Sequence, residues 1–206
     1  MSLGGGTKLT REEISQFLDT LPPGPGSVEL AKAVAASALR FVPRGQPLGT
    51  GLFDAVALHT VSCAFEAVAL RRGNDGILRV YLARRADDDT AYPGEYHCPG
   101  SIRRPDERWA DVASRLSSRE FRCQVTNPRH VGNIFTAEAR GSFISFVFLV
   151  DLEGVTNEDK WYPVDKLPRP MVNIHKKMII PLAVAAFELE EAAARLAELK
   201  QRFCHH

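Results

Sequence analysis

Apolar residues recur along this chain with two different periods, and the period changes near residue 55. In the first 55 residues they recur every three or four positions, which predicts helices. Thr10 and Glu13 form a capping-box pattern, and the apolar stripe that follows it is Ile14, Phe17, Leu18 and Leu21. After a break at residues 22–26, Ser27 is expected to cap a second helix with the stripe Leu30, Val34, Ala38 and Phe41. We therefore predict a helical extension over residues 1–55.

Between residues 56 and 168 the pattern predicts strands arranged around one helix. Apolar runs at 59–70 and 77–83 are separated by a turn with Asp75-Gly76, a strong hairpin signal. A helix is expected from about residue 105 to Phe121, and its inward stripe is Trp109, Val112, Ala113 and Leu116. The runs at 130–137 and 142–152 predict a second hairpin, which turns at residues 138–141.

Residues 169–206 predict a long C-terminal helical segment, from about Met171 to Phe203. Pro181 is expected to start a fresh helix or to kink one. Apolar residues then repeat every seven positions, at Leu182, Leu189, Leu196 and Phe203. Two interpretations fit this stripe. It packs on the N-terminal helices of the same chain, which we favour, or it forms a homodimer as a coiled-coil seam.

The composition narrows the class of protein and its expected partners but does not indicate a particular function. The chain has 206 residues, of which 45% are hydrophobic and 25% charged, as in an ordinary globular protein. A formal net charge of +1 argues against binding to nucleic acid or to an anionic membrane. The sequence has neither a signal-peptide pattern nor an apolar run of membrane-spanning length. Four cysteines without a C-x-x-C pair indicate free thiols, so we expect a cytoplasmic protein.

Residues 99–123, PGSIRRPDERWADVASRLSSREFRC, resemble the box of the Nudix (MutT-like) hydrolases, G-x5-E-x7-R-E-U-x-E-E-x-G-U. If Ser101, which follows Gly100, takes the place of the first glycine, Glu107 and Arg115 match the outer Glu and Arg. A second register, four residues later, reads 119–121 as R-E-U. The segment Lys160–Pro168 also resembles a late part of Nudix domains. The resemblance implies an α/β fold, a Nudix-like α/β/α sandwich with a mixed sheet.

The same resemblance implies where a metal would bind. In the first register the metal-ligating glutamates of the family correspond to Leu116, Arg119 and Glu120, and in the second to Glu120, Cys123 and Gln124. Glu120 is the one carboxylate in either set, so it is the expected metal ligand and catalytic residue. Glu138 is the candidate for a second catalytic carboxylate from outside the box. Gly100, Ser101, Glu107 and Arg115 are expected to be structural, with an ion pair between Glu107 and Arg115.

Two functions remain open on these residues. The first is a Nudix-like domain that acts on or binds a nucleoside-diphosphate-linked compound, with metal-dependent hydrolysis weak or lost. The second is an active pyrophosphohydrolase that uses Glu120 with carboxylates from outside the box. We favour the first, because Mg²⁺ or Mn²⁺ held by so few oxygen ligands would bind weakly or not at all. Whether the chain is an enzyme is left undecided by the residues, and its expected partner is a nucleotide-like small molecule.

Overall fold

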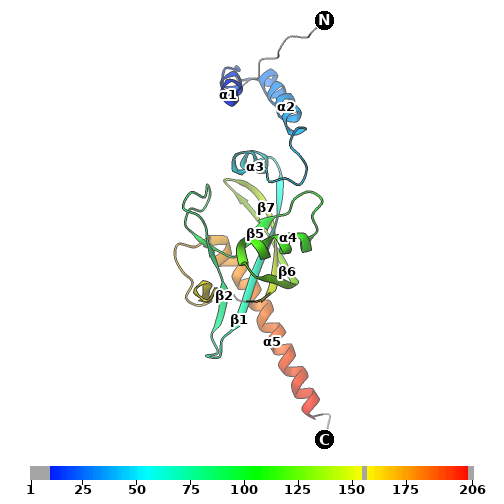
Figure 1. Ribbon diagram of the computed structural model, residues 1–206, viewed down its shortest axis with the longest axis vertical. Helices are drawn as coiled ribbons and strands as arrows, with labels where there is room; N and C mark the ends of the chain where they lie inside the picture. Colours follow the sequence, from blue (N-terminus) through cyan, green and yellow to red (C-terminus); the bar gives the residue numbers. More distant parts are fainter. Residues whose placement is uncertain (1–9, 155–156, 204–206) are drawn as a thin grey trace. The chain divides into compact units, whose positions relative to one another are not determined.

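The computed structural model of the protein describes residues 10–154 and 157–203 (Figure 1). The chain divides into two compact units, one that ends at Gln46 and one that begins at Pro47. We describe each unit by itself. The domain boundaries expected after residues 55 and 168 stay predictions.

The first unit contains two helices, α1 (Arg11–Asp19) and α2 (Pro25–Leu39). The capping box is confirmed, because the Thr10 side chain accepts from the Glu13 N–H and the Glu13 carboxylate accepts from the Thr10 N–H. The expectation that Ser27 caps α2 is wrong. Pro25 occupies the first turn, where its missing N–H costs nothing, and the Ser27 hydroxyl donates instead to the Pro22 carbonyl.

The second unit begins with a helix that the sequence pattern did not predict, α3 (Thr50–Ala57). It continues with the strands β1 (Val61–Arg72), β2 (Leu78–Tyr81), β3 (Ala83–Arg84), β4 (Tyr96–His97) and β5 (Gly100–Ile102). Next come α4 (Trp109–Leu116), a π-helical turn (Ser117–Phe121), β6 (Gln124–Glu138) and β7 (Gly141–Glu153). The described chain ends with a 3-10 turn (Glu158–Lys160), β8 (Trp161–Pro163), a second π-helical turn (His175–Ile179) and α5 (Ile180–Phe203).

The main sheet is mixed, in the order β6-β7-β1-β2-β8, with β5 paired to β1. Strands β1 and β7 run parallel, whereas the other pairs in this sheet are antiparallel. Both predicted hairpins are confirmed, since β2 folds back on β1 and β7 folds back on β6. Strands β3 and β4 form a separate two-stranded sheet.

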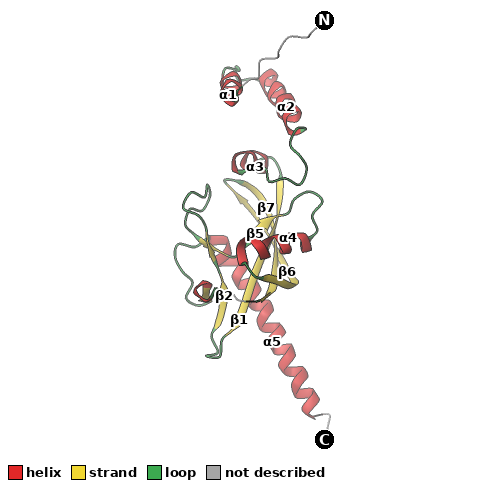
Figure 2. Ribbon diagram, viewed as in Figure 1, coloured by secondary structure: helices red, strands yellow, loops and turns green. Residues whose placement is uncertain are grey.

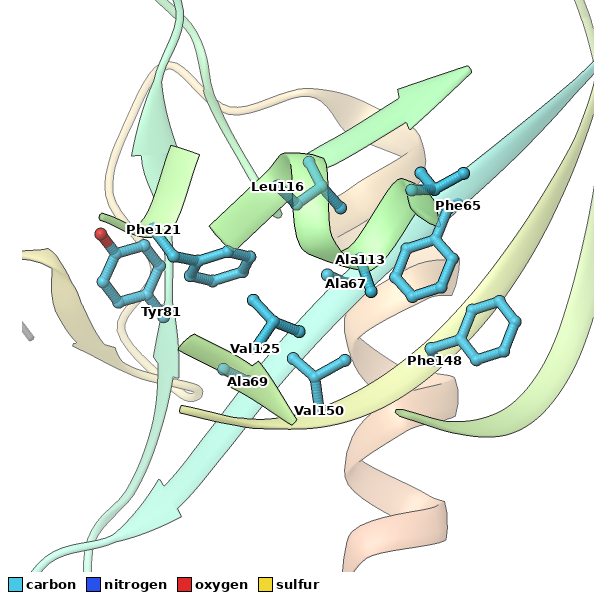
Figure 3. Close-up of a cluster of buried hydrophobic side chains, with 11 residues drawn as sticks. Phe65, Ala67, Ala69, Tyr81, Ala113, Leu116, Phe121, Val125, Phe148 and Val150 are labelled. Atoms are coloured by element: carbon cyan, nitrogen blue, oxygen red, sulfur yellow. The ribbon is translucent and has the colours of Figure 1, made fainter. Parts of the chain in front are cut away.

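Successive residues on the central strands point to opposite faces of the sheet, and each face carries its own apolar core. In β1, Phe65, Ala67 and Ala69 join one buried cluster, and Val68 joins the other. The first cluster packs under α4 through Val112, Ala113 and Leu116, of which Figure 3 labels Ala113 and Leu116. The second packs under α5 through Ile180 and Ala183. Helices thus cover both faces of the sheet (Figure 2), which confirms the α/β/α sandwich.

The long C-terminal helix is confirmed, and Pro181 lies in its first turn. A π-helical turn precedes it, because Pro181 has no N–H to donate to the backbone carbonyl four residues earlier. Leu182 packs against the second cluster, whereas Leu189 and Leu196 are 72% and 54% exposed. Among the described residues, no helix combines the length and apolar character needed to cross a bilayer.

Candidate functional site

A cavity of about 280 Å³ lies beside the β6–β7 hairpin, on the face of the sheet that α5 covers farther along. It is bordered by α3, β1, β4, β5, β6, β7, the segment between β3 and β4, and residues 172–175. Its apolar walls include Phe53, Ile102, Phe143 and Ile174. Its titratable side chains are Glu66, Arg85, Tyr92, His97, Glu138, Arg140 and His175. The cavity therefore combines apolar walls with several polar groups, as ligand sites usually do.

Glu66 lies on the central strand β1, inside an otherwise apolar run. Because Phe65 faces the α4 side, Glu66 faces the cavity side, and its side chain is only 12% exposed. The Ser145 hydroxyl donates to it across 3.4 Å, and a Cβ on Gly100 would lie 2.4 Å from its Oε2 atom. Glycine at position 100 thus leaves room for this carboxyl. Burial raises the pKa of Glu66 to about 8, although Ser145 and Arg85 oppose the shift.

Two buried histidines stand next to Glu66. His175 Nε2 lies 4.0 Å from Glu66 Oε2, and His175 Nδ1 accepts a hydrogen bond from the Cys98 N–H at 3.2 Å. The His97 ring meets the His175 ring edge to face, with 5.9 Å between centroids. Burial lowers the pKa of His175 to about 3 and that of His97 to about 4. Both imidazoles are therefore uncharged at neutral pH.

Arg85 borders the cavity from the segment after β3. Its Nη2 atom donates to Asp89 at 2.6 Å, and its guanidinium lies 5.7 Å from the centre of the Tyr92 ring. Burial raises the pKa of Asp89, but Arg85 and the N–H groups of Ala91 and Tyr92 lower it by more. Within the described part of the chain, Arg85 Nε is the one buried side-chain nitrogen or oxygen without a hydrogen-bond partner. A buried donor without a partner in the protein would be satisfied by an acceptor atom of a bound ligand.

Glu138 and Arg140 border the cavity from the tip of the β6–β7 hairpin. Glu138 accepts a hydrogen bond from the Tyr92 hydroxyl, whose pKa is raised by burial and by this contact. Arg140 donates to Asp54 on α3 at 2.8 and 3.1 Å. The hairpin can approach α3 because position 141 is glycine with φ +134°. A Cβ there would lie 2.2 Å from the Ala57 carbonyl oxygen.

The ion pair expected between Glu107 and Arg115 is present, and the two side chains are 18% and 13% exposed. Arg115 donates to both carboxylate oxygens of Glu107, to the Ile102 carbonyl and to the Ser101 hydroxyl. Arg122, which takes the place of the second box glycine in the first register, has a left-handed backbone with φ +56°. The turn therefore keeps the conformation that favours glycine. The ion pair of Glu107 with Arg115 and the left-handed backbone at Arg122 both agree with the register that begins at Ser101.

The positions implied for metal ligation do not form an oxygen-rich site. Leu116 is 2% exposed and packs in the core under α4 (Figure 3), and Arg119 is exposed. Glu120 lies in the π-helical turn after α4; with burial and Cys123, its charge raises the pKa of Tyr81. Across residues 10–154 and 157–203, no three His, Cys, Asp or Glu side chains converge to hold a metal ion. The described residues therefore do not fit the divalent metal that the fold implies.

The structure divides the sequence-predicted site residues between two places. Glu138, Gly100 and Ser101 border the cavity, whereas Glu120, Glu107 and Arg115 do not. The roles assigned to these residues stay predictions. Sequence reasoning did not single out Glu66 or His175. The available signal for Glu66 was a lone carboxylate in the apolar strand run CAFEAVAL, and a buried charge there needs a reason.

Comparison with known proteins identifies the fold. No protein-family model and no curated protein matches the sequence. A mutT/nudix family protein from Listeria innocua is similar in structure, with a TM-score of 0.50 and 16% identity, over 66% of this chain and 98% of that one. A MutT Nudix hydrolase from Burkholderia pseudomallei gives 0.49 and 18%, over 60% and 97% of the two chains. The Nudix domain of NrtR from Shewanella oneidensis, solved with ADP-ribose, gives 0.48 and 16%, over 62% and 89%. The protein thus has the Nudix fold.

Proposed function

We propose that the cavity between α3, β1 and the β6–β7 hairpin binds a nucleoside-diphosphate-linked compound, and that metal-dependent hydrolysis is weak or lost. The observation that carries this proposal is the unpaired Nε of Arg85 beside the cavity. Arginine matches the geometry of phosphate oxygens, and a buried donor without a partner costs free energy until an acceptor meets it.

The charges around the cavity support an anionic ligand. Arg85 and Arg140 are cationic and donate to Asp89 and Asp54, which do not line the cavity, and the acidic side chains on its border are Glu66 and Glu138. Glu66 holds its proton at neutral pH, because its pKa is raised to about 8 by burial. The lining residues therefore bring two guanidinium groups beside apolar walls that suit a base or a sugar.

The residues of the box helix support weak or lost hydrolysis. Leu116 has no ligating atom, and Arg119 is a cation where the family has a carboxylate. Glu120 would then be the single box ligand, too few for a Mg²⁺ or Mn²⁺ ion that neutralises a diphosphate. Glu138 borders the cavity, so it would contact the bound compound and, in the enzyme alternative, would be the carboxylate recruited from outside the box.

Three further predictions accompany this proposal. We propose a cytoplasmic protein whose partner is the small molecule rather than nucleic acid, in line with its net charge of +1. A homodimer through α5 is supported by the exposure of Leu189 and Leu196. Light scattering at micromolar concentration tests it, and a monomeric mass would remove it.

The test is calorimetric titration with ADP, ADP-ribose and UDP-glucose, using the wild type, Arg85→Gln and Arg84→Gln. Arg84 is the matched control, because it is exposed, pairs with its own aspartate, Asp87, and does not border the cavity. We expect binding of at least one compound, weakened about tenfold or more by Arg85→Gln and less than twofold by Arg84→Gln. Absence of binding to the whole panel, or equal losses in the two variants, would contradict the proposal.

An assay for release of AMP or UMP from the same three compounds, with and without Mg²⁺ or Mn²⁺, separates the two functions. We expect the metals to add little or no turnover. Efficient metal-dependent release would favour the pyrophosphohydrolase instead.

A further inference from the structure

We propose that Glu66 meets the ligand as an uncharged carboxylic acid. Together with His175 it forms a hydrogen-bonding floor that selects a compound presenting an acceptor atom, such as a nucleobase ring nitrogen or carbonyl. This inference rests on the proposed function, because it names the groups that would recognise the uncharged part of the nucleoside-diphosphate-linked compound.

The position of the Glu66 carboxyl is fixed by three strands. It extends from the central strand β1, accepts from Ser145 on β7, and lies against Gly100 on β5, where a Cβ would come within 2.4 Å of Oε2. With its side chain 12% exposed, the carboxyl is close to dry yet borders the cavity. A ligand in the cavity would therefore meet this carboxyl with little water around it.

The hydrogen bond from the Cys98 N–H fixes the tautomer of His175. Because Nδ1 accepts that bond, the proton of the neutral ring is on Nε2, which therefore donates. Nε2 lies 4.0 Å from Glu66 Oε2, too far for a direct hydrogen bond. One ligand atom can therefore accept from both the Nε2–H of His175 and the hydroxyl of a protonated Glu66.

Charged and titratable groups face Glu66 from every neighbouring element. They are Arg85 and Tyr92 on the segment after β3, His97 on β4, the Cys98 thiol, Glu138 on β6, Arg140 on the hairpin and His175 before α5. Burial outweighs the attraction to Arg85 and raises the pKa of Glu66 to about 8, and Glu138 acts in the same direction. At neutral pH the floor is uncharged, so it does not repel a diphosphate nearby.

Ionisation of Glu66 would remove the donor and add a negative charge beside the ligand. Binding of an anionic compound should therefore weaken as the pH rises through about 8. Glutamine at this position keeps the shape and a donor but does not titrate. Alanine removes the group altogether.

The experiment is titration of ADP-ribose between pH 6.5 and 9, a range in which neither its diphosphate nor its adenine titrates. We expect the affinity of the wild type to fall about tenfold from pH 7 to pH 9, since each unit of pH above the pKa of one linked proton costs a factor of ten. Glu66→Gln should bind within about threefold of the wild type at pH 7 and show no such fall. Glu66→Ala should lose about tenfold at pH 7.

A second measurement does not need a ligand. Difference infrared spectroscopy of the free protein should show the carbonyl band of a protonated carboxyl at pH 7, absent in Glu66→Gln and fading in the wild type by pH 9. Absence of this band, or a wild type and Glu66→Gln with the same pH profile for ADP-ribose, overturns the inference.

The two proposals fail in distinguishable ways. If the panel compounds bind and depend on Arg85 but not on Glu66, the inference fails while the proposed function stands. If none of them binds to the wild type, the proposed function fails and the inference fails with it.

Discussion

The box helix and the cavity lie on opposite faces of one sheet and use their polar residues in opposite ways. Around α4 the polar side chains connect the box loop to the helix and so stabilise the fold. Arg115 donates to Glu107, Ser101 and Ile102, and Leu116 is buried in the core. Around the cavity, Glu66 is protonated at neutral pH, and Arg85 Nε has no hydrogen-bond partner. In this molecule the segment with the recognisable motif supports the fold, and the face without a motif carries the cavity that we propose as the ligand site.

The largest expected effect tests whether α4 is core rather than a metal face. Leu116→Glu should destabilise the protein by about 4 kcal/mol or more, because it places a carboxylate among buried apolar side chains. Arg119→Glu, on the exposed side, should change stability by about 0.5 kcal/mol or less. Urea denaturation measures both. A stable Leu116→Glu variant that binds Mg²⁺ would show that the helix still presents a metal face.

The next prediction tests whether His175, beside the cavity, is buried in its uncharged form. The pKa of His175 is lowered to about 3, so its stabilising contribution is fully present above pH 6.5 and is lost as the pH falls toward 3. Between pH 7 and pH 5, the wild type should lose about 2 kcal/mol more of its unfolding free energy than His175→Gln. Glutamine can still accept from the Cys98 N–H. The exposed His59→Gln should behave like the wild type, and parallel curves for all three proteins would contradict the prediction.

A smaller effect concerns the turn that ends the box. Arg122 holds φ +56°, which favours glycine, so Arg122→Gly should stabilise the protein by about 1 kcal/mol. The control Arg119→Gly, whose residue belongs to the π-helical turn, should destabilise by about the same amount. Thermal unfolding measures both. A loss of stability with Arg122→Gly would mean that this turn is held by the arginine side chain rather than strained by its backbone.

The smallest expected effect separates the two faces most directly. Glu120 does not border the cavity, so Glu120→Gln should change the affinity for the nucleotide panel by less than about twofold, within the range of a surface substitution. Calorimetry beside Arg85→Gln provides the comparison. If Mg²⁺-dependent turnover exists and Glu120→Gln abolishes it, the active-hydrolase alternative is correct and the face of α4 takes part in the chemistry.

The sequence alone determined the features that depend on local chemistry. Asp75-Gly76 indicated the first hairpin, and the stripe from Trp109 to Leu116 gave the side of α4 that packs on the sheet. The capping box at Thr10 was correct for the same reason, since its partners are three residues apart. The ion pair of Glu107 and Arg115 came from the box resemblance and spans only eight residues.

Only the tertiary structure decided which residues share the cavity. Glu66, Arg85, Glu138 and His175 come from segments up to 109 residues apart, and no local period links them. Their protonation states also depend on tertiary burial, because the same carboxyl has a pKa of 4.5 in water and about 8 on this strand. Helix α3 was missed because it is 8 residues long and begins after Gly49 without a side-chain cap, so the usual signals of a helix start are missing. Sequence patterns specify elements and their faces, whereas desolvation and convergence at one end of the sheet specify the site.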